Sequence, residues 1–157
     1  MSALRKVAEN DFVLFAARLV LGGLFLYACA DKIHHPADFA TSIRNYRFLP
    51  GALVNLWAIA LPWVELLVGL ALVLGFWSRG AGLVSTLLFF SFVIALSVAL
   101  ARGLDISCGC FEGGEAGSTI TPLYVVRDSC LTLLSAAVAG FGGGRFALDR
   151  VAGKRVI

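Results

Sequence analysis

Four long apolar segments dominate the sequence and decide what it can fold into. They cover roughly residues 12–30, 52–77, 80–101 and 122–144 of a chain of 157 residues. A helix needs about 20 predominantly apolar residues to cross the hydrocarbon core of a bilayer. The mean hydropathy of +0.88 and the 15% of charged residues are far from the values of soluble domains. The sequence therefore predicts an all-α polytopic membrane protein, a four-transmembrane-helix bundle that forms a single domain over residues 1–157.

A short amphipathic helix is expected between the first two spans. Pro36 suits the first position of a helix, and Asp38 would complement the positive helix N-terminus. Phe39, Ile43 and Tyr46 recur at helical spacing and would share one face. Such a helix can lie in the membrane interface or pack on the rest of its own protein.

The first apolar segment also has features of a cleaved signal peptide, since Ala28-Cys29-Ala30 looks like a small-residue cleavage site. Glu9 and Asp11 before the segment and Arg18 inside it argue against that reading. We therefore expect the segment to remain as the first transmembrane helix.

Basic residues are distributed unequally between the two sides of the predicted bundle. The amino terminus, a tight turn at Ser78-Arg79 and the carboxyl tail share one side, which holds seven basic residues: Arg5, Lys6, Arg79, Arg145, Arg150, Lys154 and Arg155. The other side holds four: Lys32, Arg44, Arg47 and Arg102. Basic loops stay inside, so both termini are expected in the cytoplasm of a bacterium and the third loop in the periplasm. The net charge of +3 thus indicates topology and not nucleic-acid binding.

The third loop carries a Cys-Gly-Cys sequence at Cys108 and Cys110. A thiolate is a nucleophile and a metal ligand, and disulfides persist in the periplasm. A disulfide across a single residue closes a very small ring, and strained, exposed disulfides are the labile and catalytic ones. Gly109 can adopt the backbone angles that such a ring demands. The pattern predicts that Cys108 and Cys110 are redox-active.

Four further residues could assist these thiols. Cys29, near the end of the first span, and Cys130, early in the fourth, fall on the same side of the bundle as the third loop. Both could relay electrons, or both could be small packed residues. Arg127 could stabilise a thiolate in the loop, or it could form a local salt bridge with Asp128.

Arg18 and Glu65 lie inside predicted spans, where charge is costly and usually faces a partner or a cavity. Counted from the helix ends they lie at similar depth, which predicts an ion pair between them. The pair could fix helix register or belong to a quinone or proton path, so these two residues are the candidates for contacting a cofactor. No metal site is expected, because zinc-type Cys and His spacings are missing and the adjacent His34 and His35 would not converge on a helix.

Several short motifs follow one another along the chain: Arg18-Leu19-Val20-Leu21-Gly22, Asp31-Lys32-Ile33, Asn45-Tyr46-Arg47, Leu61-Pro62-Trp63-Val64-Glu65, Cys108-Gly109-Cys110-Phe111 and Val126-Arg127-Asp128. This ordered set resembles the DoxX/MauE group of bacterial redox-associated membrane proteins, most closely its MauE-like branch. The resemblance implies a role in forming disulfides in exported partners, alongside a thioredoxin-like protein. DoxX-like relatives are linked to oxidation of thiosulfate or sulfide. The chain has C-x-C where the quinone-linked disulfide-forming enzymes have C-x-x-C.

We therefore expect an inner-membrane thiol–disulfide redox protein. Cys108 and Cys110 would exchange electrons with a periplasmic thioredoxin-like partner or an exported protein that contains cysteines, and a quinone or a second cysteine pair would accept them. Two other classes remain open: a non-catalytic scaffold subunit of a redox complex, and a small thiol-dependent carrier or metal-binding membrane protein. The sequence does not decide whether the chain is itself an enzyme.

Overall fold

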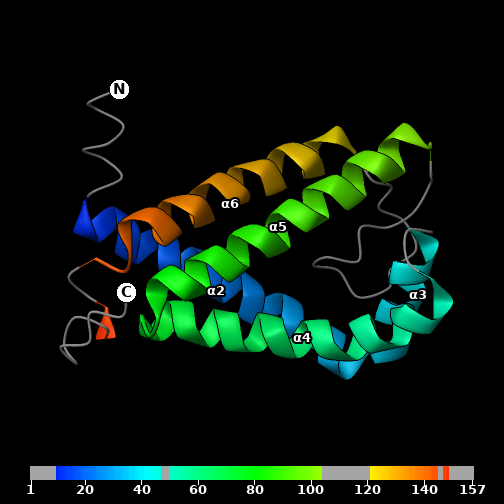
Figure 1. Cartoon of the computed structure of the whole chain (residues 1–157), viewed down its shortest axis with the longest axis horizontal. Helices are drawn as coiled ribbons and strands as arrows, with labels where there is room; N and C mark the ends of the chain where they lie inside the picture. The colour runs from blue at the N-terminus through cyan, green and yellow to red at the C-terminus, as the bar shows by residue number, and fades with distance from the viewer. Residues whose placement is uncertain (1–9, 47–49, 104–120, 145–146, 149–157) are drawn as a thin grey trace.

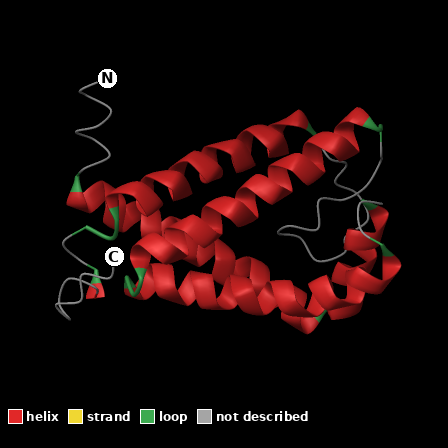
Figure 2. Ribbon diagram, viewed as in Figure 1, coloured by secondary structure: helices red, strands yellow, loops and turns green. Residues whose placement is uncertain are grey.

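Five helices make up the part of the chain that the computed structural model describes, which is residues 10–46, 50–103, 121–144 and 147–148 (Figure 1). They are α2 (Asp11–His34), α3 (Pro36–Asn45), α4 (Gly51–Leu74), α5 (Ser78–Ala101) and α6 (Pro122–Phe141). No strand occurs among the described residues (Figure 2). Four of the helices are long and apolar enough to cross a membrane, which confirms the all-α, four-span fold class.

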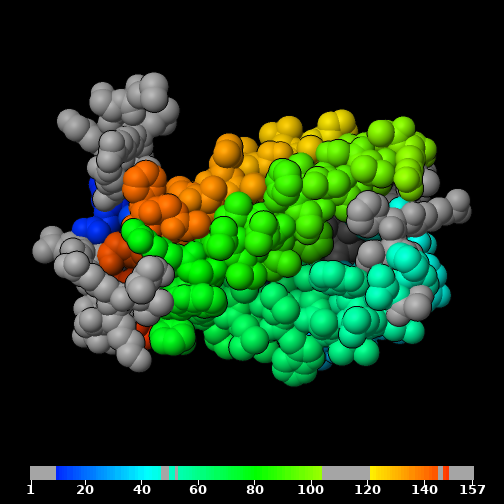
Figure 3. Space-filling model, viewed as in Figure 1, coloured from blue at the N-terminus to red at the C-terminus, as the bar shows by residue number. Residues whose placement is uncertain are grey.

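The four long helices form two antiparallel pairs, α2 with α4 and α5 with α6 (Figure 1). The start of α2, the turn between α4 and α5, and the end of α6 lie at one end of the bundle, which we call the inner end. The opposite end, the outer end, carries α3 and the last residues of α5. From their shared turn α4 and α5 diverge toward the outer end. Side chains close the space between α4 and α5 near the turn (Figure 3).

Helices α2 and α4 approach each other closely at Gly22 and Gly69. A Cβ atom built on Gly22 would lie 2.9 Å from the Gly69 carbonyl oxygen, and one on Gly69 would lie 3.1 Å from the Gly22 oxygen. Only residues without a side chain allow two backbones to come this close. The contact fixes the register of α2 against α4. Around it lies the main apolar core, which draws on all four long helices: Ala17, Leu21, Phe25, Val68, Leu72, Ala81, Phe89 and Val138.

The turn between α4 and α5 lies earlier than the sequence suggested. The helix α4 ends at Leu74 because Gly75 adopts a left-handed conformation (φ 70°), and its N–H group bonds back to α4 carbonyls. Trp77 is also left-handed (φ 50°), and two such residues so close together reverse the chain. The turn predicted at Ser78-Arg79 is therefore wrong, since both residues already belong to α5.

The short helix expected between the first two spans is confirmed as α3. Pro36 occupies its first turn and Asp38 its positive end, as predicted. Phe39 and Ala40 are buried against three residues of α4: Val54, Ala58 and Leu61. The helix thus packs on its own protein, and a place in the membrane interface stays a prediction.

Pro122 opens α6, at a position where the missing N–H group of proline costs no helical hydrogen bond. Thr121 precedes it in the capping position, but its side chain makes no capping hydrogen bond.

Candidate functional site

A buried ion pair joins the two helices of the first pair. Lys32 Nζ of α2 donates to Glu65 Oε1 of α4 at 2.5 Å. The two residues are 3% and 1% exposed. Side chains on a helix lean toward its N-terminus, so in antiparallel helices they lean toward each other. Lys32 therefore reaches inward and Glu65 outward, and they meet although Lys32 is near the outer end of α2.

The predicted ion pair between Arg18 and Glu65 is wrong. Arg18 donates from Nε to the Leu72 carbonyl at 3.0 Å and from Nη1 to the Gly143 carbonyl at 2.5 Å. Leu72 lies in the last turn of α4, where carbonyl groups lack helical partners and carry the negative end of the helix dipole. The Arg18 side chain, 1% exposed, thus fastens α2, the end of α4 and the chain after α6 at the inner end. The prediction put Arg18 and Glu65 at similar depth because it counted residues from the end of each helix. That count does not include how α2 and α4 are placed relative to each other.

Two aromatic rings surround the ammonium group of Lys32. Its Nζ lies 4.9 Å from the centre of the Phe39 ring and 5.5 Å from that of Phe92. The negative face of an aromatic ring attracts a cation, and the attraction is stronger where water is excluded. Helices α2, α3, α4 and α5 therefore all contribute to holding this charge.

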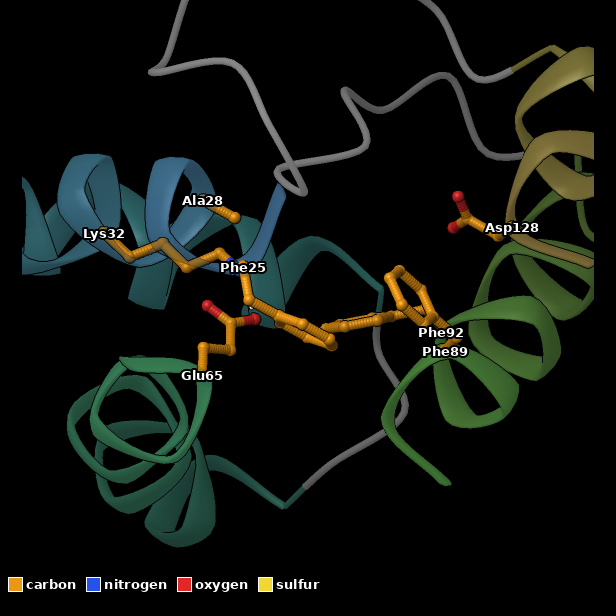
Figure 4. Close-up of a pocket in the computed structure, with 7 residues that line it drawn as sticks. All are labelled: Phe25, Ala28, Lys32, Glu65, Phe89, Phe92 and Asp128. Carbon is orange, nitrogen blue, oxygen red and sulfur yellow. Dashed lines mark hydrogen bonds and ion pairs between the residues drawn. The ribbon is translucent and has the colours of Figure 1, made fainter. Parts of the chain in front are cut away.

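A small, partly enclosed pocket lies beside the pair, with room for about one water molecule. Its walls come from α2, α4, α5 and α6: Phe25, Ala28, Lys32, Glu65, Phe89, Phe92 and Asp128. Figure 4 shows Asp128 on the wall opposite Lys32 and Glu65, with the three phenyl rings between them. The pocket thus places one base and two acids around an apolar floor.

The local salt bridge between Arg127 and Asp128 is confirmed, with Arg127 Nε donating to Asp128 Oδ1 at 2.9 Å. Arg127 also lies over the Tyr124 ring, at 5.0 Å from its centre. Asp128 is 1% exposed and acts electrostatically on Tyr46, at the end of α3. Burial, together with the Asp128 charge, raises the pKa of Tyr46 to about 12. Its phenol group therefore stays protonated and remains a hydrogen-bond donor at neutral pH.

The structure describes two of the four predicted redox thiols. Cys108 and Cys110 lie outside the described residues. Cys29 and Cys130 are free thiols; Cys29 is buried in α2, and Cys130 is exposed on α6. The Cys29 Sγ donates to the Leu26 carbonyl, and the charges of Glu65 and Lys32 act on it. Cys29 thus lies beside the buried ion pair, whereas Cys130 faces away from the bundle.

Lys32 is the site residue that the sequence reasoning missed, because it was assigned to a loop. The signal was present. The buried positions of α2 recur at intervals of three and four residues and end at Lys32: Leu14, Ala17, Arg18, Leu21, Gly22, Phe25, Ala28, Cys29 and Lys32. A lysine that continues an apolar stripe faces the bundle and needs an acidic partner.

Fold and site together define a multi-pass membrane protein with a charged cluster buried between its helices. By sequence, residues 10–141 match the family described as methylamine utilisation protein MauE. The chain belongs to this family. The MauE-like part of the expected resemblance is thereby confirmed, while its DoxX part stays a prediction.

Relatives named methylamine utilization protein MauE are similar over most of the chain. The relative from Paracoccus denitrificans is 35% identical over 83% of this chain and 70% of its own. That from Methylorubrum extorquens is also 35% identical, over 88% of this chain and 73% of its own. The Methylophilus methylotrophus relative is 31% identical over 87% and 72%, respectively. No solved structure matches the chain.

Proposed function

We propose that the protein is an inner-membrane thiol–disulfide redox protein that serves exported proteins of methylamine utilisation. Cys108 and Cys110 form its reactive pair, and a periplasmic thioredoxin-like protein or an exported cysteine-containing protein is its partner. The relatives' shared name supports the metabolic setting. The Cys-Gly-Cys sequence supports the chemistry.

One observation supports the proposal: Gly103 and Thr121, the described residues on either side of the segment that contains Cys108 and Cys110, both belong to the outer end of the bundle. Cys29 and Lys32 lie in the outer half of α2, and Lys32 reaches from there to Glu65 of α4. Thiol exchange at the outer end of the bundle would therefore take place on the side from which Lys32 reaches Glu65.

The orientation follows from charge. Lys32 is buried inside the bundle, so it no longer counts as a loop charge, and three basic residues remain on the outer side against seven on the inner. Basic loops stay in the cytoplasm, which puts both termini there and the Cys-Gly-Cys loop in the periplasm.

The exchange proceeds in two steps. A partner thiolate attacks one sulfur of the Cys108–Cys110 disulfide, which gives a mixed disulfide and releases the other cysteine as a thiolate. A second partner thiolate then displaces the attached cysteine, so the partner gains a disulfide and this chain becomes a dithiol. The dithiol is then reoxidised: its two electrons and two protons pass to a membrane quinone, which becomes the quinol, or to a second disulfide, which becomes a dithiol.

Mixed-disulfide trapping tests the proposal. Either Cys108→Ser or Cys110→Ser should accumulate a disulfide-linked complex with a periplasmic protein, because the cysteine that would resolve it is missing. Cys130→Ser is the control, since it leaves both loop thiols in place, and it should trap nothing. If neither loop variant traps a partner and their thiols stay reduced, a scaffold role replaces the redox one.

A further inference from the structure

Exposed aromatic side chains gather at the inner end of the bundle, where three parts of the chain contribute them. They are Phe12 at the start of α2, Phe76 and Trp77 in the turn between α4 and α5, and Phe141 at the end of α6. The Trp77 ring packs on the backbone of Gly80, where any Cβ atom would collide with it. Exposed aromatic residues at one level of a membrane protein mark the boundary between hydrocarbon and headgroups.

The glycine contact between α2 and α4 gives a common level from which depth on both helices can be measured, since Gly22 and Gly69 lie against each other. At 1.5 Å per residue, Phe12 lies about 15 Å from this level toward the inner end. The exposed Trp57 of α4 lies about 18 Å from it toward the outer end. These two aromatic levels are thus about 33 Å apart along the helix axes, and helices tilted by about 20° would cover roughly 31 Å of bilayer over that length. The hydrocarbon core of a bilayer is about 30 Å thick.

The surface of α4 between the two levels suits lipid. Every exposed residue from Trp57 to Leu74 is apolar, including Trp63 and Leu67. The first exposed polar side chain toward the outer end is that of Asn55, just beyond Trp57. The apolar surface of α4 therefore ends where its outer aromatic residue lies.

Helix α2 changes from apolar to polar at the same level. Its exposed residues stay apolar outward from Phe12 except for Tyr27, and the next exposed polar side chain is that of His34. At 1.5 Å per residue, His34 lies about 18 Å outward of Gly22, as Trp57 does of Gly69. The phenol of Tyr27 is the exception within this surface, and a hydroxyl group is far less costly in hydrocarbon than a charge.

The exposed hydroxyl groups of α5 are also compatible with lipid. Ser91 Oγ donates to the Leu88 carbonyl and Ser97 Oγ to the Val93 carbonyl, both at 2.7 Å. Each hydroxyl thus finds its acceptor within its own helix, as polar groups must where no water is present.

Helix α3 lies beyond the outer level (Figure 1). Its apolar residues Phe39 and Ala40 pack on α4, while Asp38, Thr41 and Arg44 are exposed. A helix that turns its apolar face to its own protein and its charges outward suits headgroups and water, not acyl chains.

We propose that the bundle binds the bilayer with its hydrocarbon core between the level of Phe12 and Trp77 and the level of Trp57, and with α3 in the outer headgroup layer. An indole ring is suited to each boundary because its body is apolar and its N–H group is polar. Glu65 lies about 6 Å outward of Gly69 at 1.5 Å per residue, so the ion pair with Lys32 lies inside the hydrocarbon layer, beneath α3. This placement does not depend on the thiol chemistry or on which end faces the periplasm.

Tryptophan fluorescence tests the placement, because the chain has three tryptophans and all of them, Trp57, Trp63 and Trp77, are exposed. Variants that keep one tryptophan and carry phenylalanine at the other two positions are reconstituted in phosphatidylcholine vesicles with bromine atoms at known acyl-chain depths. Bromines close to the headgroups should quench Trp57 and Trp77 most strongly, and bromines deeper in the chains should quench Trp63 most strongly. The depth of Trp63 should exceed that of Trp57 by about 9 Å, from their separation along α4.

The opposite depth order, with Trp57 or Trp77 quenched most by the deepest bromines, would overturn the placement. A Trp63 that no brominated lipid quenches would also overturn it, because another protein would then cover that face of α4. Circular dichroism shows whether each variant keeps its helices, and the exchange of one exposed aromatic ring for another should leave them intact.

Labelling with a membrane-impermeant maleimide, from both sides of the vesicle, checks α3 separately. Thr41→Cys on α3 should be labelled, whereas the matched variant Leu67→Cys, also at an exposed position, should not. Mass spectrometry reads the label at the introduced residue, so the native cysteines stay in place. Protection of Thr41→Cys as complete as that of Leu67→Cys would put α3 in the hydrocarbon, and labelling of Leu67→Cys would put water where lipid is proposed. Either result would overturn the placement, and neither bears on mixed-disulfide trapping.

Discussion

A double-mutant cycle on Lys32 and Glu65 should reveal a strong coupling that Arg18 and Glu65 lack. The perturbations are Lys32→Met and Glu65→Leu, which remove charge but keep most of the buried volume. Both side chains are almost fully buried and share a 2.5 Å hydrogen bond. Removing one partner of a buried pair leaves an unpaired charge and costs about 3–5 kcal/mol.

The two single changes should not cost the same. After Glu65→Leu, the ammonium of Lys32 still lies against the rings of Phe39 and Phe92, which retain about 1–2 kcal/mol of attraction. After Lys32→Met, both oxygens of Glu65 lack a described partner, so this change should approach the upper end of that range. The double variant should recover most of the loss, because an apolar pair of similar volume often replaces a buried ion pair without cost.

The assay is equilibrium unfolding in mixed detergent micelles, followed by helical circular dichroism. A second cycle with Arg18→Met and Glu65→Leu is the matched control. Arg18 bonds to carbonyls of Leu72 and Gly143 at the inner end, so its loss should simply add to that of Glu65. Additive losses for Lys32 and Glu65, or strong coupling between Arg18 and Glu65, would refute the site as described.

Three further outcomes follow from the structure. Gly22→Ala should destabilise the bundle by about 1–3 kcal/mol because its Cβ would press on α4, whereas Gly23→Ala, which meets nothing within 4 Å, should not; equal unfolding midpoints would contradict the close contact. Between pH 10 and about 12 the unfolded chain loses the Tyr46 proton while the folded chain keeps it, so a stability contribution present below pH 10 should fall by about 1–2 kcal/mol across that interval; Tyr46→Phe should lack this component in alkaline melts. Topology reporters fused after Ile157 and near Glu115 should report opposite sides of the membrane, and matching sides would invert the orientation proposed here.

Hydropathy was sufficient to predict the four long helices, because lipid requires every spanning segment to satisfy its own backbone. It could not position the buried charges. Depth counted along single helices placed Arg18 opposite Glu65, but side-chain direction and the register set at Gly22 and Gly69 bring Lys32 there instead. Side-chain direction across the interface and helix register depend on how two helices pack against each other. The hydrophobic periodicity of one helix does not contain this information.

Local chemistry was predicted better than distant contacts. Neighbours in sequence, such as Arg127 and Asp128, interact as predicted because adjacency alone brings them within reach. That Asp128 also faces Glu65 across a pocket depends on the two helix pairs diverging toward the outer end. The early end of α4 was missed because Gly75 was read as part of an apolar run, although its left-handed conformation is what stops the helix.

The redox state of Cys108 and Cys110 tests the central claim most directly. Membranes are equilibrated in glutathione buffers of graded potential, their free thiols are alkylated, and the chain is analysed by mass spectrometry. Structural disulfides resist reduction, with potentials below about −300 mV, so a catalytic pair should titrate well above that value. We predict that both loop cysteines change together from disulfide to dithiol while the helices remain folded. Thiols that stay fully alkylatable in oxidising buffer would contradict the redox account.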